Sequence, residues 1–231
     1  WTLTSNTTQE NCYGDSTGSI TVNVNGGSGA FTYDIGNGPQ NSATFSNLSQ
    51  GSYSISVSDG SCNSIIQVVL AGPSEITGTI TTTDVSCNGL SDGSLSVVGS
   101  GGNGTYTYDF GSGLGSNNTI NGLPAGSQTV IIQDGNGCIG TVSGTVSQPG
   151  AINVSTYVVD ETFGSDGAIN ITVSGGVPPF SFSWTGPSGY TSTNEDIGGL
   201  VGGSYTLVVT DVSGCSDQFT QIINEPNCDI F

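Results

Sequence analysis

Three stretches of the chain are nearly alike: SYSISVSDGSC at residues 52–62, SQTVIIQDGNGC at 127–138 and SYTLVVTDVSGC at 204–215. Their closing cysteines are 76 and then 77 residues apart, and the prolines Pro73, Pro149 and Pro226 keep the same spacings. A period of this length is that of a small domain rather than of one solenoid turn. The spacing therefore predicts three domains, at residues 1–73, 74–149 and 150–231.

Each of these stretches alternates apolar and polar residues, as a strand with one buried face does. The same alternation precedes a Gly-Gly turn at 20–24, 95–97 and 169–173, and an aromatic strand follows the turn at 31–33, 106–108 and 180–184. A last strand is predicted from each closing cysteine to the boundary proline. Gly and β-branched residues recur too often for helices. Strands separated by turns every 8–12 residues are typical of a β-sandwich.

We therefore expect an all-β fold of three tandem Ig-like β-sandwich domains. The pattern Leu-x-x-Gly-x-Tyr, at Leu48–Tyr53 and Leu200–Tyr205, predicts a tyrosine corner, whereas Gln128 replaces the tyrosine in the middle repeat. The aromatic strands are predicted to face the core, and Tyr190 to be the most exposed aromatic residue. The linkers 71–75 and 147–151 are short and contain proline, which favours an elongated rod.

The charge of the chain excludes several functions. Eighteen Asp and Glu residues face no Lys, Arg or His, so the formal net charge is -18. Nothing can neutralise phosphate, which excludes electrostatic binding of nucleic acid, and adsorption to anionic lipid is disfavoured. Catalytic roles that need Lys, Arg or His are excluded as well. Stability must come from apolar burial, backbone hydrogen bonds and disulfides.

Six cysteines in so polar a chain indicate an oxidising compartment. The sequence has no apolar run of 18 residues, so we expect no membrane insertion. It also has no initiator Met and no signal peptide, and we interpret it as a mature exported chain or a piece of a longer one.

The cysteine positions predict disulfides within repeats. Cys12 and Cys62 are 50 residues apart, Cys87 and Cys138 are 51 apart, and both pairs occupy equivalent positions in their repeats. We expect one disulfide within each of these two repeats. A metal site is the rival interpretation, but CxxC spacing and histidine are lacking.

The third repeat departs from this pattern. An alignment without gaps places Glu161 where a cysteine is expected, which leaves Cys215 without a partner in its repeat. Either the chain folds back to join Cys215 to Cys228, or Cys228 bonds to a following domain or another subunit.

We expect no enzymatic activity and no cofactor, because no carboxylate pair stands out. The recurring Asp59, Asp134 and Asp211 are explained by Asp-turn chemistry. Calcium is the metal candidate, since it prefers oxygen ligands. Its weak candidate ligands lie beside the predicted linkers: Glu75 and Asp84 at the first, Asp160 and Glu161 at the second.

Asn-x-Ser/Thr sequons are candidate glycan acceptors if the host has N-glycosylation. They begin at Asn6, Asn47, Asn103, Asn117, Asn153 and Asn170.

The middle repeat then carries a family resemblance. Cys87-Asn-Gly-Leu-Ser-Asp-Gly-Ser-Leu-Ser-Val97, followed by Gly-Gly, Thr-Tyr-Thr-Tyr, Gly122-Leu-Pro-Ala-Gly126 and Asp134-Gly-Asn-Gly-Cys138, resembles the SprB-type repeat of Bacteroidetes surface adhesins, including the gliding-motility adhesin. The segment Ser174-Gly-Gly-Val-Pro-Pro-Phe-Ser-Phe-Ser-Trp184 is similar to the centre of the same repeat. Glu161 in place of cysteine and Gln128 in place of tyrosine depart from the pattern.

The resemblance implies export by the type IX system, display on the outer surface and a filamentous, adhesive role. It implies no catalytic residues. It also implies O-glycosylation at Asp-Ser/Thr followed by a small or aliphatic residue, a pattern that Asp15-Ser16-Thr17 matches at Ser16.

We therefore expect a structural and adhesive segment of an extracellular bacterial surface filament or giant repeat adhesin. Its partners would be neighbouring repeats or subunits of the same filament, and surface glycans. One alternative is a pilus-like subunit that polymerises by strand exchange, with a terminal strand such as 2–8 completing a neighbour's sheet. Another is a carbohydrate-binding array of a secreted protein.

Overall fold

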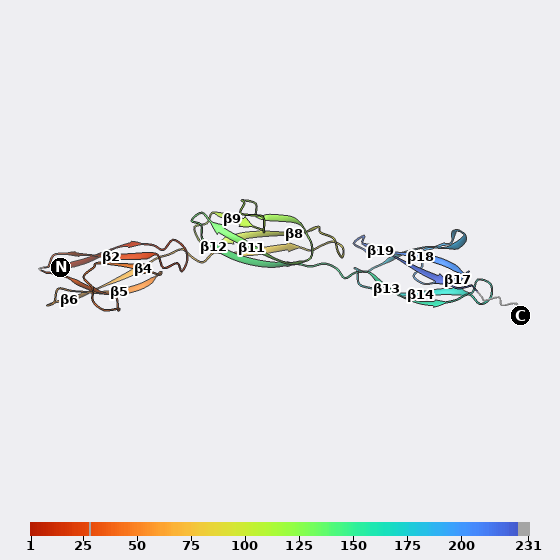
Figure 1. Cartoon of the computed structure of the whole chain (residues 1–231), viewed down its shortest axis with the longest axis horizontal. Coiled ribbons are helices and arrows are strands. Elements are labelled where there is room, and N and C mark those ends of the chain that lie inside the picture. Colours follow the sequence, from red (N-terminus) through yellow and green to blue (C-terminus); the bar gives the residue numbers. More distant parts are fainter. Residues whose placement is uncertain (28, 226–231) are drawn as a thin grey trace. The chain divides into compact units, whose positions relative to one another are not determined.

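The structure, a computed structural model, describes residues 1–27 and 29–225 (Figure 1). Strands account for almost all of its regular structure, and the helix found in those residues is a single 3-10 turn, Pro187–Gly189. The all-β prediction is confirmed. None of the described residues forms a helix long and apolar enough to cross a membrane.

The strands form two sheets within each repeat. In the first repeat, one sheet has the order β1-β2-β4 and the other the order β3-β5-β6. These strands are β1 (Thr2–Thr8), β2 (Gly18–Asn25), β3 (Thr32–Asp34), β4 (Thr44–Leu48), β5 (Gly51–Ser58) and β6 (Asn63–Leu70).

The middle repeat has the same arrangement, with sheet orders β10-β8-β7 and β12-β11-β9. Its strands are β7 (Thr77–Thr83), β8 (Gly93–Ser100), β9 (Tyr106–Asp109), β10 (Thr119–Leu123), β11 (Gly126–Asp134) and β12 (Ile139–Val146).

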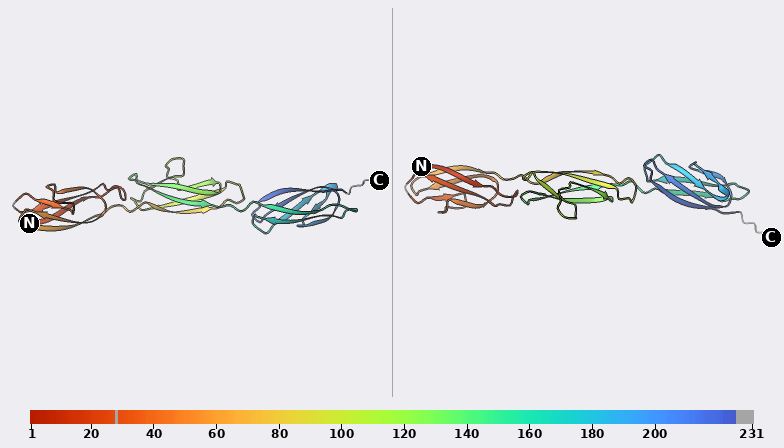
Figure 2. Two further views of the ribbon diagram at one scale, coloured as in Figure 1. Left: turned by 60° about the horizontal axis from the view of Figure 1, so that its bottom comes forward. Right: turned by 90° about the horizontal axis from the view of Figure 1, so that it is seen from above.

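The third repeat adds one short strand, so its sheets have the orders β13-β14-β17 and β16-β15-β18-β19. Its strands are β13 (Asn153–Val159), β14 (Gly167–Ser174), β15 (Ser181–Thr185), β16 (Thr191–Ser192), β17 (Ile197–Leu200), β18 (Gly203–Thr210) and β19 (Ser216–Ile223). Figure 2 shows the two sheets of the first and third repeats as two layers.

The alternating residues bury one face of each sheet, as predicted. In the first repeat Ile20 of β2 faces Ile55 and Val57 of β5, and all three are fully buried. The aromatic strand supplies Tyr33 there and Trp184 in the third repeat, where the indole Nε1 donates to the backbone carbonyl of Asn194 at 3.1 Å. The aromatic strands therefore contribute to the cores.

The prediction for Tyr190 is wrong. This residue is half-buried and packs edge to face on Tyr205, with the ring centroids 5.4 Å apart. Phe163 is the most exposed aromatic side chain among those described, at 91%. It lies in a polar loop, where the sequence has no alternation of apolar and polar residues from which its exposure could be predicted.

The segment at the start of each repeat, threonine-rich in the first two, is a strand of that repeat's own sheet. In the first repeat, β1 pairs antiparallel with β2 along its whole length, from Thr2 opposite Asn25 to Thr8 opposite Ser19. Its side chains are largely exposed, so it carries almost no hydrophobic pattern.

The predicted tyrosine corners are present. The hydroxyl of Tyr53 donates to the backbone carbonyl of Ser49 at 2.7 Å, and that of Tyr205 donates to the carbonyl of Val201 at 3.0 Å. Each bond ties the start of a strand to the loop before it. Burial raises the pKa of the Tyr205 hydroxyl.

The contacts divide the chain into two compact units that differ from the three predicted domains. One unit holds Trp1–Thr81, Ser96–Thr119 and Gln128–Gly144; the other holds Thr82–Leu95, Ile120–Ser127 and the described residues from Thr145 onward. The division passes through the middle repeat. The domain boundaries at 73 and 149 and the rod shape stay predictions.

Candidate functional site

The first unit contains a disulfide that joins two repeats. Cys12, in the loop between β1 and β2, is bonded to Cys138, in the turn between β11 and β12. The two Cα atoms are 5.5 Å apart, although the residues are separated by 126 positions in the sequence. The bond therefore links the first repeat to the middle repeat.

The loop that carries Cys12 is organised by Asp15. One carboxylate oxygen of Asp15 accepts the backbone N–H of Cys12 at 2.9 Å, and the other accepts the N–H and the hydroxyl of Thr17. The hydroxyl of Thr17 and these backbone donors lower the pKa of Asp15. An ionised carboxylate therefore fixes the loop without any cationic side chain.

The turn that carries Cys138 is organised by Asp134 in the same manner. Its Oδ1 accepts the N–H of Asn136 and the N–H of Cys138, both at 2.9 Å, and its Oδ2 accepts the N–H of Asn103 at 3.1 Å. Asp134 is only 5% exposed, so these donors compensate for the burial of its carboxylate. The predicted turn role of this residue is confirmed.

The linker into the middle repeat lies beside this disulfide. The N–H of Gly102 donates to the carbonyl of Ser74 at 3.0 Å, and Ile76 is buried. A hollow of about 330 Å³, lined among others by Tyr13, Pro73 and Glu75, lies next to the two cysteines. The junction thus has two covalent connections, the linker and the disulfide.

The second unit repeats this arrangement. Cys87, in the loop between β7 and β8, is bonded to Cys215, in the turn between β18 and β19, with a Cα–Cα distance of 5.6 Å. Asp211 accepts the N–H groups of Ser213 and Cys215, as Asp134 does for its turn. This bond links the middle repeat to the third.

The second linker is bonded to the cysteine loop as well. The side-chain amide of Asn88 donates to the carbonyl of Pro149 at 3.0 Å, and the N–H of Gly89 donates to the side-chain oxygen of Gln148 at 2.9 Å. Ile152 is buried where the chain enters β13. A hollow of about 320 Å³ lies beside this disulfide.

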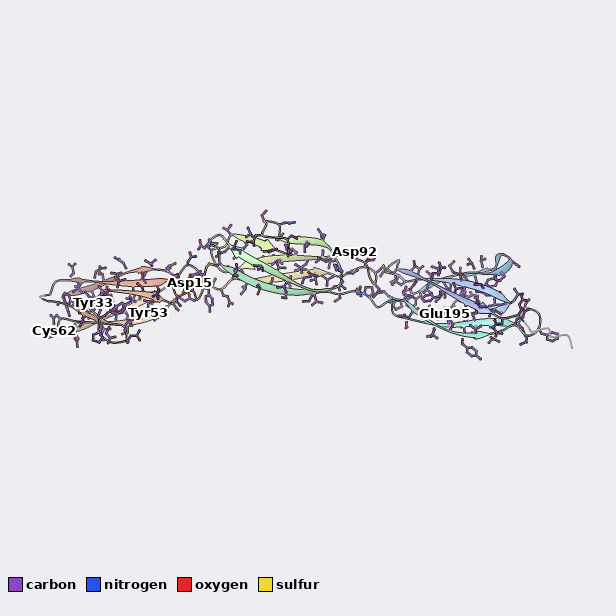
Figure 3. The ribbon with its side chains drawn as sticks, in the orientation of Figure 1. Asp15, Tyr33, Tyr53, Cys62, Asp92 and Glu195 are labelled. Carbon is purple, nitrogen blue, oxygen red and sulfur yellow. A yellow bond between two sulfur atoms is a disulfide. The ribbon has the colours of Figure 1, made fainter. Side chains whose placement is uncertain are left out.

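The predicted disulfides within repeats are wrong. Cys62 lies beyond the far end of β5, whereas the loop of Cys12 lies near the start of that strand, because Gly18 pairs with Leu48. Eight residues of extended strand separate the two ends by about 26 Å, far more than the ~7 Å that a disulfide allows between Cα atoms. Figure 3 shows Cys62 and Asp15, which holds the Cys12 loop, at opposite ends of the first repeat. Cys87 and Cys138 likewise have partners in other repeats.

The fold-back bond between Cys215 and Cys228 is also wrong, because Cys215 is bonded to Cys87. Cys228 itself lies outside the described residues. Cys62 is an exposed free thiol.

The alignment of Glu161 with the cysteines requires correction. The N–H of Glu161 donates to the carbonyl of Asn224, as the N–H of Val85 donates to the carbonyl of Ser147. Glu161 is therefore the counterpart of Val85, which lies two residues before Cys87.

The loop of the third repeat is two residues shorter than that of the middle repeat. Asp92 accepts the N–H of Ser86, six positions earlier, whereas Asp166 accepts the N–H of Thr162, only four positions earlier. In the alignment of Glu161 with Val85, Phe163 occupies the position that Cys87 has in the middle repeat. The third repeat therefore offers no cysteine in this loop.

The calcium candidates do not gather at the linkers as predicted. Asp84 follows β7 and accepts the N–H of Ser147, in the second linker, whereas Glu75 precedes β7. Asp160 follows β13 and accepts both N–H groups of Asn224, and Glu161 accepts the N–H of Gly202 at 2.7 Å. Because β7 separates Glu75 from Asp84, these two cannot share an ion, and β13 separates Asp160 and Glu161 from the second linker. No group of three metal-ligating side chains occurs among the described residues.

The candidate glycan acceptors are mostly accessible. The exposed ones are Asn6, Asn47, Asn103, Asn117, Asn153 and Asn170. Ser16 is half-buried, and its hydroxyl is within 2.7 Å of the hydroxyl of Ser49. Glycosylation of these residues stays a prediction.

The number of cysteines in the loops and in the turns could have indicated the observed pairing. Three cysteines lie in the closing turns, but only two lie in the loops after the first strands. A pairing that connects each loop to the turn of the next repeat uses both loop cysteines and leaves the first turn cysteine over. That is the observed pattern.

Comparison with known proteins supports the repeat assignment. Residues 4–40, 79–113 and 163–189 match the model of the SprB repeat, one match in each repeat. No curated protein sequence matches the chain.

Several solved structures are similar. The ectodomain of mouse nectin-like molecule 4 (Ig1–Ig3) has 14% identity and a TM-score of 0.38, over 87% of this chain and 84% of that one. Extracellular domains 3–5 of Drosophila OTK have 9% identity and a TM-score of 0.32, over 85% of each chain. The repeat type and the two disulfides indicate an extracellular protein of the adhesion type.

Proposed function

We propose that this chain, which carries three tandem SprB-type repeats, is a structural and adhesive segment of an extracellular bacterial surface filament or giant repeat adhesin. The observation that carries the proposal is the pair of disulfides between repeats. A filament at a cell surface must transmit tension without unravelling. Disulfides placed between repeats shorten the covalent path along which tension acts and take the linkers out of that path.

The shortest covalent path through the chain follows both disulfides. It runs from Trp1 to Cys12, crosses to Cys138, returns along the chain to Cys87, crosses to Cys215 and continues to the end. About 78 peptide steps lie on this path, against about 230 in the linear chain. At about 3.4 Å per residue, the maximum extension falls from about 780 Å to about 270 Å.

We further propose that the chain is not an enzyme and needs no cofactor. The carboxylates that recur in each repeat hold turns by accepting backbone N–H groups, which accounts for their positions without chemistry. Neighbouring repeats are the partners that the junctions favour, and surface glycans stay proposed ligands. Strand exchange by β1 is less favoured, because this strand already pairs with β2. A sugar-binding face on the aromatic strands is less favoured as well, because those strands contribute to the cores.

Single-molecule force spectroscopy tests the structural part. The chain is pulled by handles at its two ends, first oxidised and then in a thiol reductant. We expect an extension limit near 270 Å that rises to about 780 Å on reduction. The double variant C138S/C215S should show the long limit without reductant, whereas C62S should keep the short one. Equal limits in the two redox states would refute the proposal.

Antibodies against the chain test the adhesive part. Immunogold labelling of intact cells of the source bacterium should decorate filaments at the outer surface, and the same antibodies should reduce attachment of the cells to glass. Label confined to the cell interior would contradict the proposed location.

A further inference from the structure

The closing turn of the first repeat is one residue shorter than the two turns that form disulfides, but its aspartate makes the same hydrogen bonds to the cysteine. Asp59 Oδ1 accepts the N–H of Ser61 at 3.0 Å and of Cys62 at 2.8 Å. The N–H of Asp59 in turn donates to the carbonyl of Cys62 at 3.2 Å, as that of Asp134 donates to the carbonyl of Cys138 at 3.0 Å. Cys62 is thus the structural counterpart of Cys138 and Cys215.

Both counterparts of Cys62 bond to the same kind of partner. Cys138 is joined to the Cys12 loop, with its Sγ 3.4 Å from the carbonyl oxygen of Asn11. Cys215 is joined to the Cys87 loop, with its Sγ 3.3 Å from the carbonyl oxygen of Ser86. The same turn therefore receives the same loop at both junctions.

The surroundings of Cys62 are those of a junction without its partner. Cys138 is 7% exposed and Asp134 5%, whereas Cys62 is exposed and Asp59 is only half-buried. Trp1 stands immediately before β1, as Ile76 stands before β7. Ile76 is buried, but Trp1 is 37% exposed and stacks on Phe31, with the ring centroids 4.8 Å apart.

We propose that Cys62 forms a disulfide with the loop cysteine of a further repeat of this kind, placed ahead of Trp1. The partner is a loop in which a cysteine is followed two positions later by glycine, as in Cys12-Tyr-Gly14 and Cys87-Asn-Gly89. Both such loops of this chain are already bonded, and the third repeat has Phe163 in the cysteine's place. The partner therefore comes from a repeat other than these three. The inference does not depend on the adhesive role.

The reaction is a two-electron oxidation, and its oxidant is a disulfide, either of a dithiol–disulfide oxidoreductase or of a small thiol such as glutathione. The loop thiolate attacks this disulfide, forming a mixed disulfide and releasing one thiolate. The Cys62 thiolate then attacks the loop sulfur, the bond to the carrier breaks, and the carrier leaves as a second thiolate. Two protein thiols are oxidised and one disulfide is reduced to two thiols.

A four-repeat chain tests the proposal. Residues 1–75, carrying C62S, are placed ahead of Trp1, so that Trp1 takes the place of Ile76, and C228S is included so that the original Cys62 is the one thiol under test. After refolding in a glutathione redox buffer, thiol titration should fall from the two groups of the unbonded chain, the added Cys12 and the original Cys62, to fewer than ~0.1 per chain. Peptide mapping should recover a bond between the added Cys12 and Cys62. The matched control carries C12S in the added copy and should keep one thiol.

A second four-repeat chain keeps the proposal testable if the first one does not fold. Residues 74–151 with C138S take the place of the added copy, so that Cys87 offers the loop thiol. The Cys12–Cys138 and Cys87–Cys215 bonds of the original repeats report correct folding in both chains. If those two bonds form while Cys62 still titrates fully in either chain, the proposal is overturned.

Discussion

The Oδ1 atom of Asp134 accepts the backbone N–H of Cys138 at 2.9 Å, so a buried carboxylate positions one sulfur of the first junction. We predict that D134A destabilises the chain by about 3 kcal/mol, because three backbone donors lose their acceptor. D59A, at the half-buried counterpart, should cost less. Urea unfolding of oxidised protein measures both variants. Equal losses would show that burial of Asp134 does not matter.

Disulfide mapping should recover Cys12–Cys138 and Cys87–Cys215. The chain has no Lys or Arg, so a protease other than trypsin is required. Elastase digestion without reductant, followed by mass spectrometry, is suitable. Cys62 should react with a thiol reagent in the native protein, and C62S should leave both bonds intact. Recovery of a Cys12–Cys62 peptide would contradict the structure.

The two tyrosine corners should differ in strength. Tyr205 is 1% exposed, whereas Tyr53 is half-buried. Y205F removes the hydroxyl of a buried side chain together with its hydrogen bond to the Val201 carbonyl and should cost about 1–2 kcal/mol. Y53F should cost less, because water can replace the hydroxyl near Ser49. Thermal unfolding of both variants measures the loss of stability. A larger loss for Y53F than for Y205F would contradict the prediction.

Acid should weaken the third repeat over a defined range. The hydroxyl of Thr162, with the N–H groups of Thr162 and Phe163, lowers the pKa of Asp166 to about 2. The unfolded value is about 3.9, so the stabilisation is present in full above about pH 5 and is lost as the pH falls toward 2. D166N should lower the melting temperature at pH 7 but not at pH 2.

A variant of the hydroxyl partner serves as the control for this prediction. T162V removes the hydroxyl and keeps the charge of Asp166, so its melting temperature should fall between those of the wild type and D166N at pH 7. The prediction fails if D166N and the wild type differ equally at both pH values.

The fold could be predicted because apolar residues such as Ile20, Val22 and Ile55 alternate with polar residues and so mark the face of each strand that is buried. The tyrosine corners and the Asp turns were also predictable, since their hydrogen bonds lie within five residues. The strands β1, β7 and β13 were not recognised as parts of their own sheets. Their side chains are mostly exposed, so they have little pattern to read.

The junctions could not be predicted in the same way. Cys62 is the cysteine nearest to Cys12 in sequence, but β5 separates the two, and the three-dimensional arrangement places Cys138 closer. Glu161 was misaligned because the loop of the third repeat is two residues shorter than that of the middle repeat. The hydrogen bonds between Asp160 and Asn224 reveal this difference, whereas an alignment without gaps cannot.

Each linkage joins two different surfaces, a loop cysteine at one end of a repeat and a turn cysteine at the other. A contact of this kind is heterologous, so it cannot close into a symmetric pair as a contact between identical surfaces does. It can instead be repeated without limit in one direction. The placement of Cys12 and Cys62 at opposite ends of one sandwich therefore gives the repeat a polarity, and favours open-ended growth over the formation of dimers.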